Sequence, residues 1–334
     1  MKKTIFLLAL AALIAGAFPA LRHTGGIPAG DAAEAAARGK YLSIATGTMS
    51  GTYYSLGNSL ASLFNDKGNG EYSFSAGASN GSGQNVEFLA AKESEFAFVN
   101  NDVAKIAYAG TGQYEKKKYD MLRGITSVYG NSIHIIVAAD SPAASVKDLA
   151  GKKVSVGAAG SGVESITRLI VGAYGMNYWD KKDFAPEYLG VSESMEKLKN
   201  GQLDAVFMTG LPPMGAVVDV FMSNKMKLLP LEASIIDQLT TEYSELYKTA
   251  IPAGSYKDQG EAVDTVANSA LILTVADMDE QLIYNLTKTI FENKDYLKER
   301  NNVWGQMTEE NATKGMTVPL HPGAERYLKE VGVL

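Results

Sequence analysis

Short stretches of alternating apolar and small or polar residues recur along the chain, each followed by a glycine-containing turn and then by apolar residues at helical spacing. The first case has an alternating segment at 41–46 and the turn Gly47–Gly57, whose later residues open a helix. That helix carries apolar residues at Tyr53, Leu56, Leu60, Leu63 and Phe64. The pattern predicts a strand, a turn and a helix.

The same order continues through the first part of the chain. A strand is predicted at 72–76, followed by the small-residue turn 77–83 and a second helix ending near Lys92. Phe96–Val99 then predicts a short buried strand, after which Asn100, Asn101 and Asp102 open another helix. Asp102 is well suited to cap that helix, so capping and turn chemistry alone remain an alternative to a functional role for these three residues.

Two further strands are predicted at 125–128 and 133–139, and the order begins again after residue 140. Strands are then predicted at 154–156 and 204–208, with turns at 157–162 and 209–213 that each lead into a helix. Two similar α/β units would place four helix N-termini around one crevice, because ligands collect at the carboxyl ends of parallel strands.

The remaining chain is predicted to return to the first unit. A helix is expected from about Ser234 to Tyr247, and Val266–Val275 is the longest apolar strand candidate. The predicted organisation is therefore lobe 1 from 41–138 plus 232–334, and lobe 2 from 139–231. The two crossings, near Ala138 and near Leu231, would form adjacent hinge segments.

The N-terminus has the pattern of an export signal. Lys2 and Lys3 precede an uncharged run from Thr4 to Leu21, with small residues suited to a signal peptidase. We predict that 1–30 are a cleaved signal peptide and leader remnant and that the mature protein is periplasmic. An uncleaved membrane anchor is the alternative, because the uncharged run approaches the length of a membrane span.

Composition narrows the classes of function. The net charge is −6, and removal of Lys2, Lys3 and Arg22 with the leader would make it −9, which disfavours nucleic acid as a partner. The chain has no cysteine, and only His134 and His321 lie beyond the leader. A thiolate nucleophile is excluded, and two histidines leave few candidate residues for a histidine metal site or a Ser-His-Asp triad. We predict no enzyme activity, catalytic residue, metal or cofactor.

The turns can still bind an anion. Ser50 and Thr52 can cap a helix whose first N–H groups and dipole favour negative charge, although a plain strand-to-helix turn is the alternative. The glycines do not form the dinucleotide fingerprint, and no Walker lysine follows them, which disfavours an enzyme that holds phosphate there. Glu164 and Arg168 stand four residues apart and predict a surface ion pair rather than a ligand-binding arginine.

Four stretches together resemble a known family. They are Gly47–Gly57, Phe96–Asp102, Asp148–Gly162 and Ile251–Tyr256. From about Tyr41 to Leu334 the chain is similar to solute-binding proteins of the TAXI type, the extracytoplasmic receptors of tripartite ATP-independent periplasmic (TRAP) transporters. The resemblance implies an α/β, two-lobed periplasmic binding protein fold of type II, with the ligand cleft between the lobes and hinge strands joining them.

The resemblance also implies a ligand site. One wall would be formed by Thr48, Ser50, Gly51, Thr52, Tyr54, Ser82, Asn101 and Asp102. The opposite wall would be formed by Gly160, Ser161, Gly162, Thr209 and Gly210. If the ligand is an amino acid, Asp102 would accept its ammonium.

The implied ligand is a small carboxylate, namely glutamate, glutamine or a related dicarboxylate. The implied partners are TRAP membrane subunits, fused or separate, and we expect a monomer. A binding protein of an ABC-type importer and a ligand sensor without transport are alternatives with the same fold.

Overall fold

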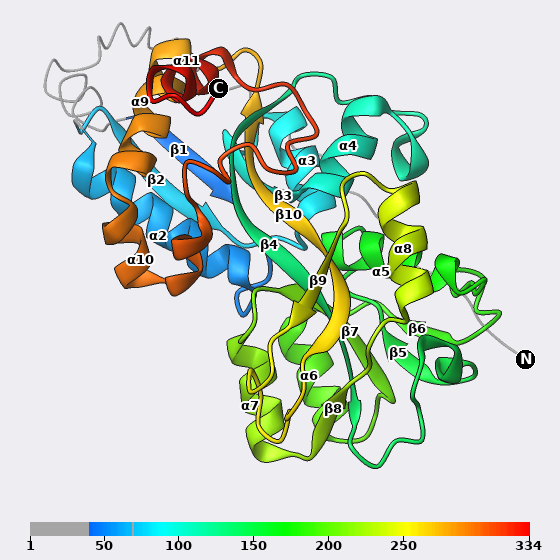
Figure 1. Ribbon diagram of the computed structural model, residues 1–334. Helices are drawn as coiled ribbons and strands as arrows, with labels where there is room; N and C mark the ends of the chain where they lie inside the picture. The colour runs from blue at the N-terminus through cyan, green and yellow to red at the C-terminus, as the bar shows by residue number, and fades with distance from the viewer. Residues whose placement is uncertain (1–39, 69) are drawn as a thin grey trace, which may run out of the picture. The chain divides into compact units, whose positions relative to one another are not determined.

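A ten-stranded sheet runs through the part of the chain that the computed structural model describes, residues 40–68 and 70–334. Its strands follow the order β2-β1-β3-β10-β4-β7-β5-β6, with β8 paired to β4 and β9 to β10. The long strands β4 (Leu122–Ala138) and β10 (Val263–Val275) are antiparallel and run through both halves of the sheet (Figure 1). The predicted signal peptide and leader at 1–30 lie outside the described residues.

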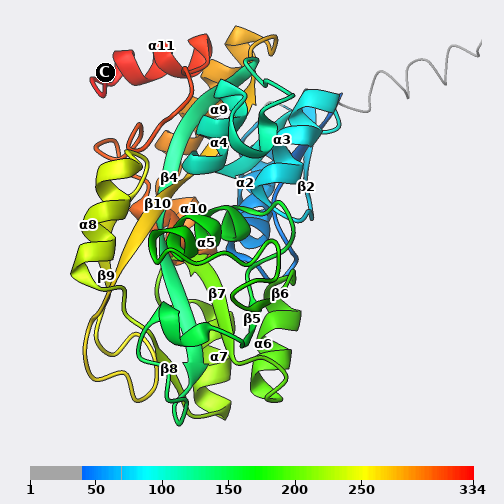
Figure 2. The same cartoon turned by 90° about the vertical axis from the view of Figure 1, so that its right-hand side faces the viewer.

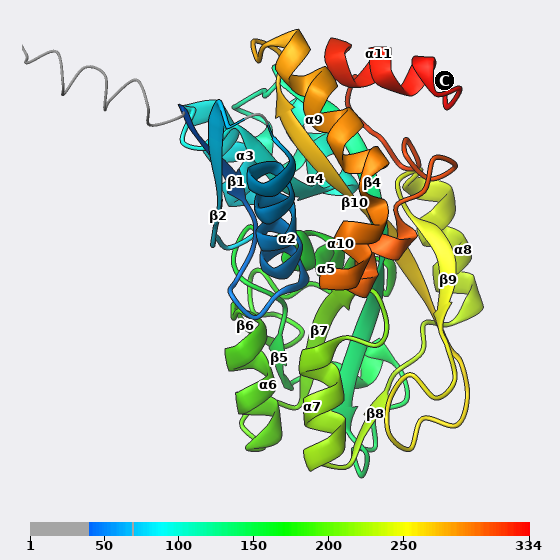
Figure 3. The ribbon, with the colours of Figure 1, turned by 90° about the vertical axis from the view of Figure 1, so that its left-hand side faces the viewer.

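The first half of the sheet contains three parallel strands. These are β1 (Lys40–Ala45), β2 (Tyr72–Gly77) and β3 (Phe96–Asn100). One face packs against α2 (Thr52–Lys67), α9 (Glu280–Glu292), α10 (Lys294–Arg300) and α11 (Pro322–Glu330), and the other against α3 (Ser82–Ala91) and α4 (Asn101–Ala109) (Figure 3). Alternation on β3 explains both cores, because Phe96 and Phe98 face the first set of helices while Ala97 and Val99 face the second.

The second half repeats this arrangement. Its strands are β5 (Lys153–Ser155), β6 (Ala185–Glu187), β7 (Ala205–Gly210) and β8 (Met226–Leu228). One face packs against α5 (Gly162–Ala173) and α8 (Ala233–Glu242), and the other against α6 (Val191–Lys199) and α7 (Gly215–Ser223). Within β7, Phe207 faces the first pair of helices and Val206 and Met208 face the second. Short 3-10 turns lie at η1 (Gly112–Tyr114), η2 (Val146–Leu149) and η3 (Asn302–Gln306).

The two strands predicted at 125–128 and 133–139 are one strand, which corrects the prediction. β4 continues for 17 residues, and the polar sequence Gly130-Asn131-Ser132 lies inside it instead of forming a turn. Its partner changes there, because residues up to Ser132 pair with β10 and residues from Ser132 onward pair with β7. β10 makes the corresponding change at Ala267. Its residues up to Ala267 pair with β9 (Tyr247–Ile251), and those from Ala267 onward pair with β4.

Further elements also differ from the sequence prediction. α8 ends at Glu242 instead of near Tyr247, and the strand β9 that follows was not predicted. Ile236 and Leu239 of α8 pack in the core of the second half, which favours a return to the first half later than residue 231. The lobe boundaries at 138/139 and 231/232 themselves remain a prediction. Asn100, not Asp102, is the N-cap of α4.

None of the helices in residues 40–68 and 70–334 combines the length and the apolar character that a membrane crossing requires.

Candidate functional site: a pocket between the two halves of the sheet

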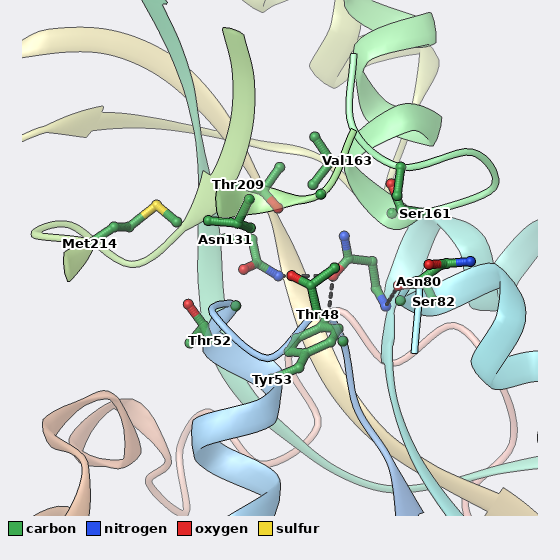
Figure 4. A pocket seen from close by; sticks show the side chains of 18 of the residues that line it. Thr48, Thr52, Tyr53, Asn80, Ser82, Asn131, Ser161, Val163, Thr209 and Met214 are labelled. Atoms are coloured by element: carbon green, nitrogen blue, oxygen red, sulfur yellow. Dashed lines mark hydrogen bonds between the residues drawn. The ribbon is translucent and has the colours of Figure 1, made fainter. Parts of the chain in front are cut away.

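A pocket of about 90 Å³ lies between the two halves (Figure 4). Thr52, Tyr53 and Ser82 line it from the first half, and Ser161, Val163 and Thr209 line it from the second. Tyr129 and Asn131 of β4 complete the lining at the place where this strand passes from one half to the other.

Six helices begin at this pocket. Their N-cap residues, all of which line it, are Gly51 of α2, Gly81 of α3, Asn100 of α4, Ser161 of α5, Gly190 of α6 and Met214 of α7. A side chain caps the helix only at Ser161, whose hydroxyl accepts from the Glu164 N–H. Because the first N–H groups of a helix have no partner within the helix and its dipole is positive at this end, the pocket favours an anion.

A network centred on Asn100 organises the polar side of the pocket. The Tyr53 hydroxyl donates to Asn100 Oδ1, and Asn131 Nδ2 donates to the same oxygen at 2.9 Å (Figure 4). The Asn100 N–H in turn donates to Ser82 Oγ at 3.0 Å. Burial raises the pKa of Tyr53 well above its usual value, so its hydroxyl keeps its proton and acts as a donor.

The structure brings part of the predicted site together. The predicted residues that line the pocket are Thr48, Gly51, Thr52, Ser82, Ser161, Gly162 and Thr209. The predicted residues that do not line it are Ser50, Tyr54, Asn101, Asp102, Gly160 and Gly210. Binding of a ligand by any of these residues stays a prediction.

Asp102 joins the two halves beside the pocket instead of lining it. Its carboxylate accepts from the Ser165 hydroxyl of α5 at 2.8 Å and from Asn268 Nδ2 of β10 at 2.7 Å. Burial raises the pKa of Asp102 to about 6, while these hydrogen bonds act in the opposite direction. Asn101 makes a similar link, since its side chain accepts from the Ser269 N–H and donates to the Glu245 carbonyl.

The other predicted residues outside the lining are Ser50, Tyr54, Gly160 and Gly210. Tyr54 lies in α2, where its carbonyl accepts from Asn58 Nδ2 at 2.8 Å. The Gly160 carbonyl accepts from the Gly83 N–H at 3.1 Å, which is a direct contact between α3 and the second half. Gly210 pairs with Ser132 in the sheet, and Ser50 lies in an exposed turn. α5 and α4 lie side by side at this junction (Figure 2), so the two halves meet directly around the pocket.

Several lining residues were not predicted from the sequence. They are Gly47, Tyr53, Asn80, Gly81, Tyr129, Asn131, Ala158, Val163, Gly190, Val191 and Met214. Asn100, for which the sequence left a functional and a capping role open, also lines the pocket. Asn131 gave no such signal, because it lies between Gly130 and Ser132, a combination typical of a turn. For Tyr53 the sequence left open closure over an apolar part of the ligand or packing in the core of its helix.

The lining residues carry no formal charge, for Asp, Glu, Lys, Arg and His are all missing from the pocket's lining. The predicted pairing of Glu164 with Arg168 is confirmed, but Glu164 is buried, so the pair is not the surface pair that was predicted. Both side chains lie outside the lining. No group of His, Cys, Asp and Glu within the described part of the chain could hold a metal ion. The pocket therefore acts through N–H and hydroxyl groups.

A buried histidine supports the α7 side of the pocket. His134 Nδ1 bonds the Ser132 carbonyl at 3.0 Å, so this nitrogen carries the proton, and Nε2 accepts from the Tyr256 hydroxyl at 2.8 Å. The Tyr256 oxygen also accepts from the N–H of Met214, the N-cap of α7, at 3.1 Å. Burial lowers the pKa of His134 to about 4 and keeps it neutral.

Two half-sheets joined by long strands, with a pocket at their junction, define the fold class of periplasmic binding proteins. The periplasmic binding protein BugD is similar to this chain at 12% identity over 87% of this chain and 95% of its own, with a TM-score of 0.54. A protein from Bordetella bronchiseptica RB50 is similar at 15% identity over 89% and 82%, with a TM-score of 0.52. These likenesses confirm the predicted α/β binding-protein fold.

A weaker likeness, with a TM-score of 0.44, links the chain to the periplasmic aliphatic sulphonate-binding protein SsuA from Escherichia coli, at 16% identity over 87% of this chain and 78% of that one. Residues 44–332 match the NMT1-like family, and the chain belongs to that family.

Proposed function

We propose that this protein is an extracytoplasmic solute-binding protein that captures a small carboxylate and delivers it to a membrane transporter. The convergence of six helix N-termini on one uncharged pocket carries the proposal. A carboxylate there accepts hydrogen bonds from several backbone amides, each charge-assisted and worth about 1.5–3 kcal/mol. Binding then needs no arginine or lysine.

Closure of the two halves over the ligand is the proposed capture mechanism. The halves already touch through the Gly83 N–H and the Gly160 carbonyl, and through Asp102 and Ser165. They are joined by the continuous strands β4 and β10, whose partners change at Ser132 and Ala267. We place the hinge at these two residues, since a small backbone rotation there moves one half relative to the other.

A TRAP transporter is the proposed membrane partner. The sequence stretches that resemble TAXI proteins support this choice, and three of them contribute residues to the pocket lining, namely Gly47–Gly57, Phe96–Asp102 and Asp148–Gly162. An ABC-type importer is the alternative partner, because the fold serves both. Co-purification of the protein with membrane subunits of one class from solubilised membranes distinguishes the two.

The test of carboxylate capture is a thermal-shift screen followed by calorimetry on the purified protein, against amino acids and C2–C6 mono- and dicarboxylates. A ligand that binds only the folded state raises the midpoint, and the expected result is a selective rise with carboxylates. Uncharged sugars are the control and should cause no shift. A rise with sugars and none with carboxylates would overturn the proposal.

The proposed periplasmic location depends on 1–30 as a cleaved signal peptide. N-terminal sequencing of protein recovered from a periplasmic fraction tests it. A mature terminus between residues 17 and 37 is expected, and an intact Met1 in the membrane fraction would favour the uncleaved anchor.

A further inference from the structure

The acceptors on the buried side of the pocket are already engaged by the protein. Asn100 Oδ1 receives two donors, from Tyr53 and Asn131, which fills both of its lone pairs. Ser82 Oγ and Ser161 Oγ each accept a backbone N–H, at 3.0 and 3.1 Å. One lone pair of each oxygen is engaged in this way, and each hydroxyl hydrogen remains available to donate to a ligand.

Donors, in contrast, remain free. Once Asn100 Oδ1 is fixed by its two donors, its Nδ2 faces Gly162, and it has no acceptor among the described residues. The first turns of α2, α6 and α7, which no side chain caps, add backbone N–H groups. Of the buried lining side chains, Asn131, which is 2% exposed, keeps a neutral acceptor, Oδ1, that no donor in the described chain occupies.

The carboxylates close to the pocket are engaged in hydrogen bonds and an ion pair with other residues of the protein. Asp102 is held by Ser165 and Asn268, and Glu164 is held by Arg168 and the Tyr178 hydroxyl. A ligand ammonium would thus find only neutral oxygens in the lining, such as Asn131 Oδ1 and the hydroxyl oxygens of Thr52 and Thr209, and no carboxylate. It would also sit in the positive field of six helix N-termini.

We infer that this pocket selects short carboxylates without an ammonium group, namely 2-oxo and 2-hydroxy acids, over the corresponding amino acids. The inference rests on the proposed function of carboxylate capture and names its substrate class. The carboxylate takes the helix N–H groups, while a 2-hydroxyl donates to Asn131 Oδ1 or a 2-oxo group accepts from Asn100 Nδ2. It replaces the expectation that Asp102 binds a ligand ammonium.

Calorimetry with matched pairs tests this inference on the protein after ligand from expression has been removed by unfolding and refolding. The pairs are pyruvate or lactate against L-alanine, and 2-oxoglutarate against L-glutamate. Each ammonium-free acid is expected to bind at least about tenfold more tightly than its amino acid. Equal or tighter binding of the amino acids overturns the inference while carboxylate capture stands. Silence with every acid overturns both.

A charge placed in the pocket provides a second test. Asn131→Asp adds the carboxylate that the pocket lacks, so it should weaken pyruvate binding by about tenfold or more and narrow or reverse the preference over alanine. Asn58→Asp, at an exposed position of α2 outside the lining, is the control with the same change of charge. Circular dichroism and thermal melting establish that both variants fold. An unchanged preference in folded Asn131→Asp contradicts the inference.

Discussion

Single glycines allow the two halves to approach each other around the pocket. A Cβ on Gly162 would lie 2.3 Å from Asn100 Nδ2 and 2.8 Å from Ser82 Oγ, both of which belong to the first half. On Gly190 it would lie 3.0 Å from the Thr48 side chain. The glycine-rich turns are therefore required for contact between the halves as well as for their own backbone geometry.

We predict that Gly162→Ala weakens ligand affinity by about tenfold or more, because the added methyl group forces Asn100 and Ser82 away from their positions. Calorimetry measures the effect. Gly172→Ala, in the same helix α5, is the control, since its Cβ would meet no atom within 4 Å. That change should leave affinity unaltered and stabilise the helix by about 0.5–1 kcal/mol. Normal affinity in Gly162→Ala would show that this contact is not needed for binding.

The buried carboxyl of Asp102 gives a prediction about pH. Its pKa is raised to about 6 in the folded protein, from an ordinary value of 3.8. The folded state therefore holds this proton more tightly, and the resulting stabilisation is complete below about pH 3.8 and is lost as the pH rises to about 6. Such a shift corresponds to a contribution on the order of 3 kcal/mol.

Asp102→Asn removes that titration. The unfolding free energy of the wild type minus that of the variant should fall as the pH rises from 4 to 7. Urea denaturation of both proteins across this range measures the difference, and the ionisation of other groups cancels in it. A difference that stays constant with pH would show that Asp102 keeps an ordinary pKa in the folded state.

Sequence reasoning at the residue scale found the positions that lie directly at strand-to-helix turns. Ser82, Ser161 and Gly162 are of this kind, and the structure places all three in the pocket lining. Asn131 lies in the middle of β4, where only pairing with distant strands decides which side chains face the pocket. Tyr53 follows the core spacing of α2, yet its hydroxyl reaches the Asn100 network.

The elements beyond the turns support the pocket through the contacts of His134. The chain His134–Tyr256–Met214 connects β4 with the segment after β9 and with the start of α7. It explains the presence of Tyr256 in the Ile251–Tyr256 stretch, because this hydroxyl orients the first turn of a helix that begins at the pocket. Neutral His134 is needed as the acceptor in this chain.

We predict that Tyr256→Phe destabilises the protein by about 1–3 kcal/mol, since it leaves His134 Nε2 and the Met214 N–H buried without partners. Thermal and urea unfolding measure the loss. Tyr41→Phe removes the same hydroxyl at a side chain that is 75% exposed and should be neutral. If the two variants were equally stable, the Met214 and His134 contacts would contribute nothing measurable.

At the scale of elements, local patterns predicted the strands and helices that pack against the same partners along their whole length. β1, α2 and β3 are examples, and their alternation or helical spacing matches the cores they enter. β4 was divided in the prediction because Gly130, Asn131 and Ser132 have turn-forming character. In the folded chain these residues pair with β10 on one side, and tertiary pairing overrides the local preference.

The whole described unit depends on two strands that belong to both halves. β4 and β10 each change their pairing partner at the level of the pocket. At Ser132, β4 passes from pairing with β10 to pairing with β7, and at Ala267, β10 passes from pairing with β9 to pairing with β4. The sequence predicted two units and a return of the chain, but it could not locate this exchange, because pairing between strands as distant in sequence as β4 and β10 leaves no local pattern. The pocket therefore lies where the two units share their sheet.

Closure of the two halves is the prediction that tests this arrangement as a whole. Binding of a carboxylate ligand should reduce the radius of gyration in solution scattering, because a ligand that contacts both halves shifts the population from open to closed conformations. Gly83→Ala should prevent that reduction, since a Cβ there would lie 2.1 Å from the Gly160 carbonyl oxygen, a backbone atom that cannot rotate away. Gly77→Ala, whose Cβ would meet nothing within 4 Å, should still close. If Gly83→Ala closes as fully as the wild type, the halves do not meet through this contact in the bound state. An identical scattering curve for the wild type with and without saturating ligand would contradict capture by closure.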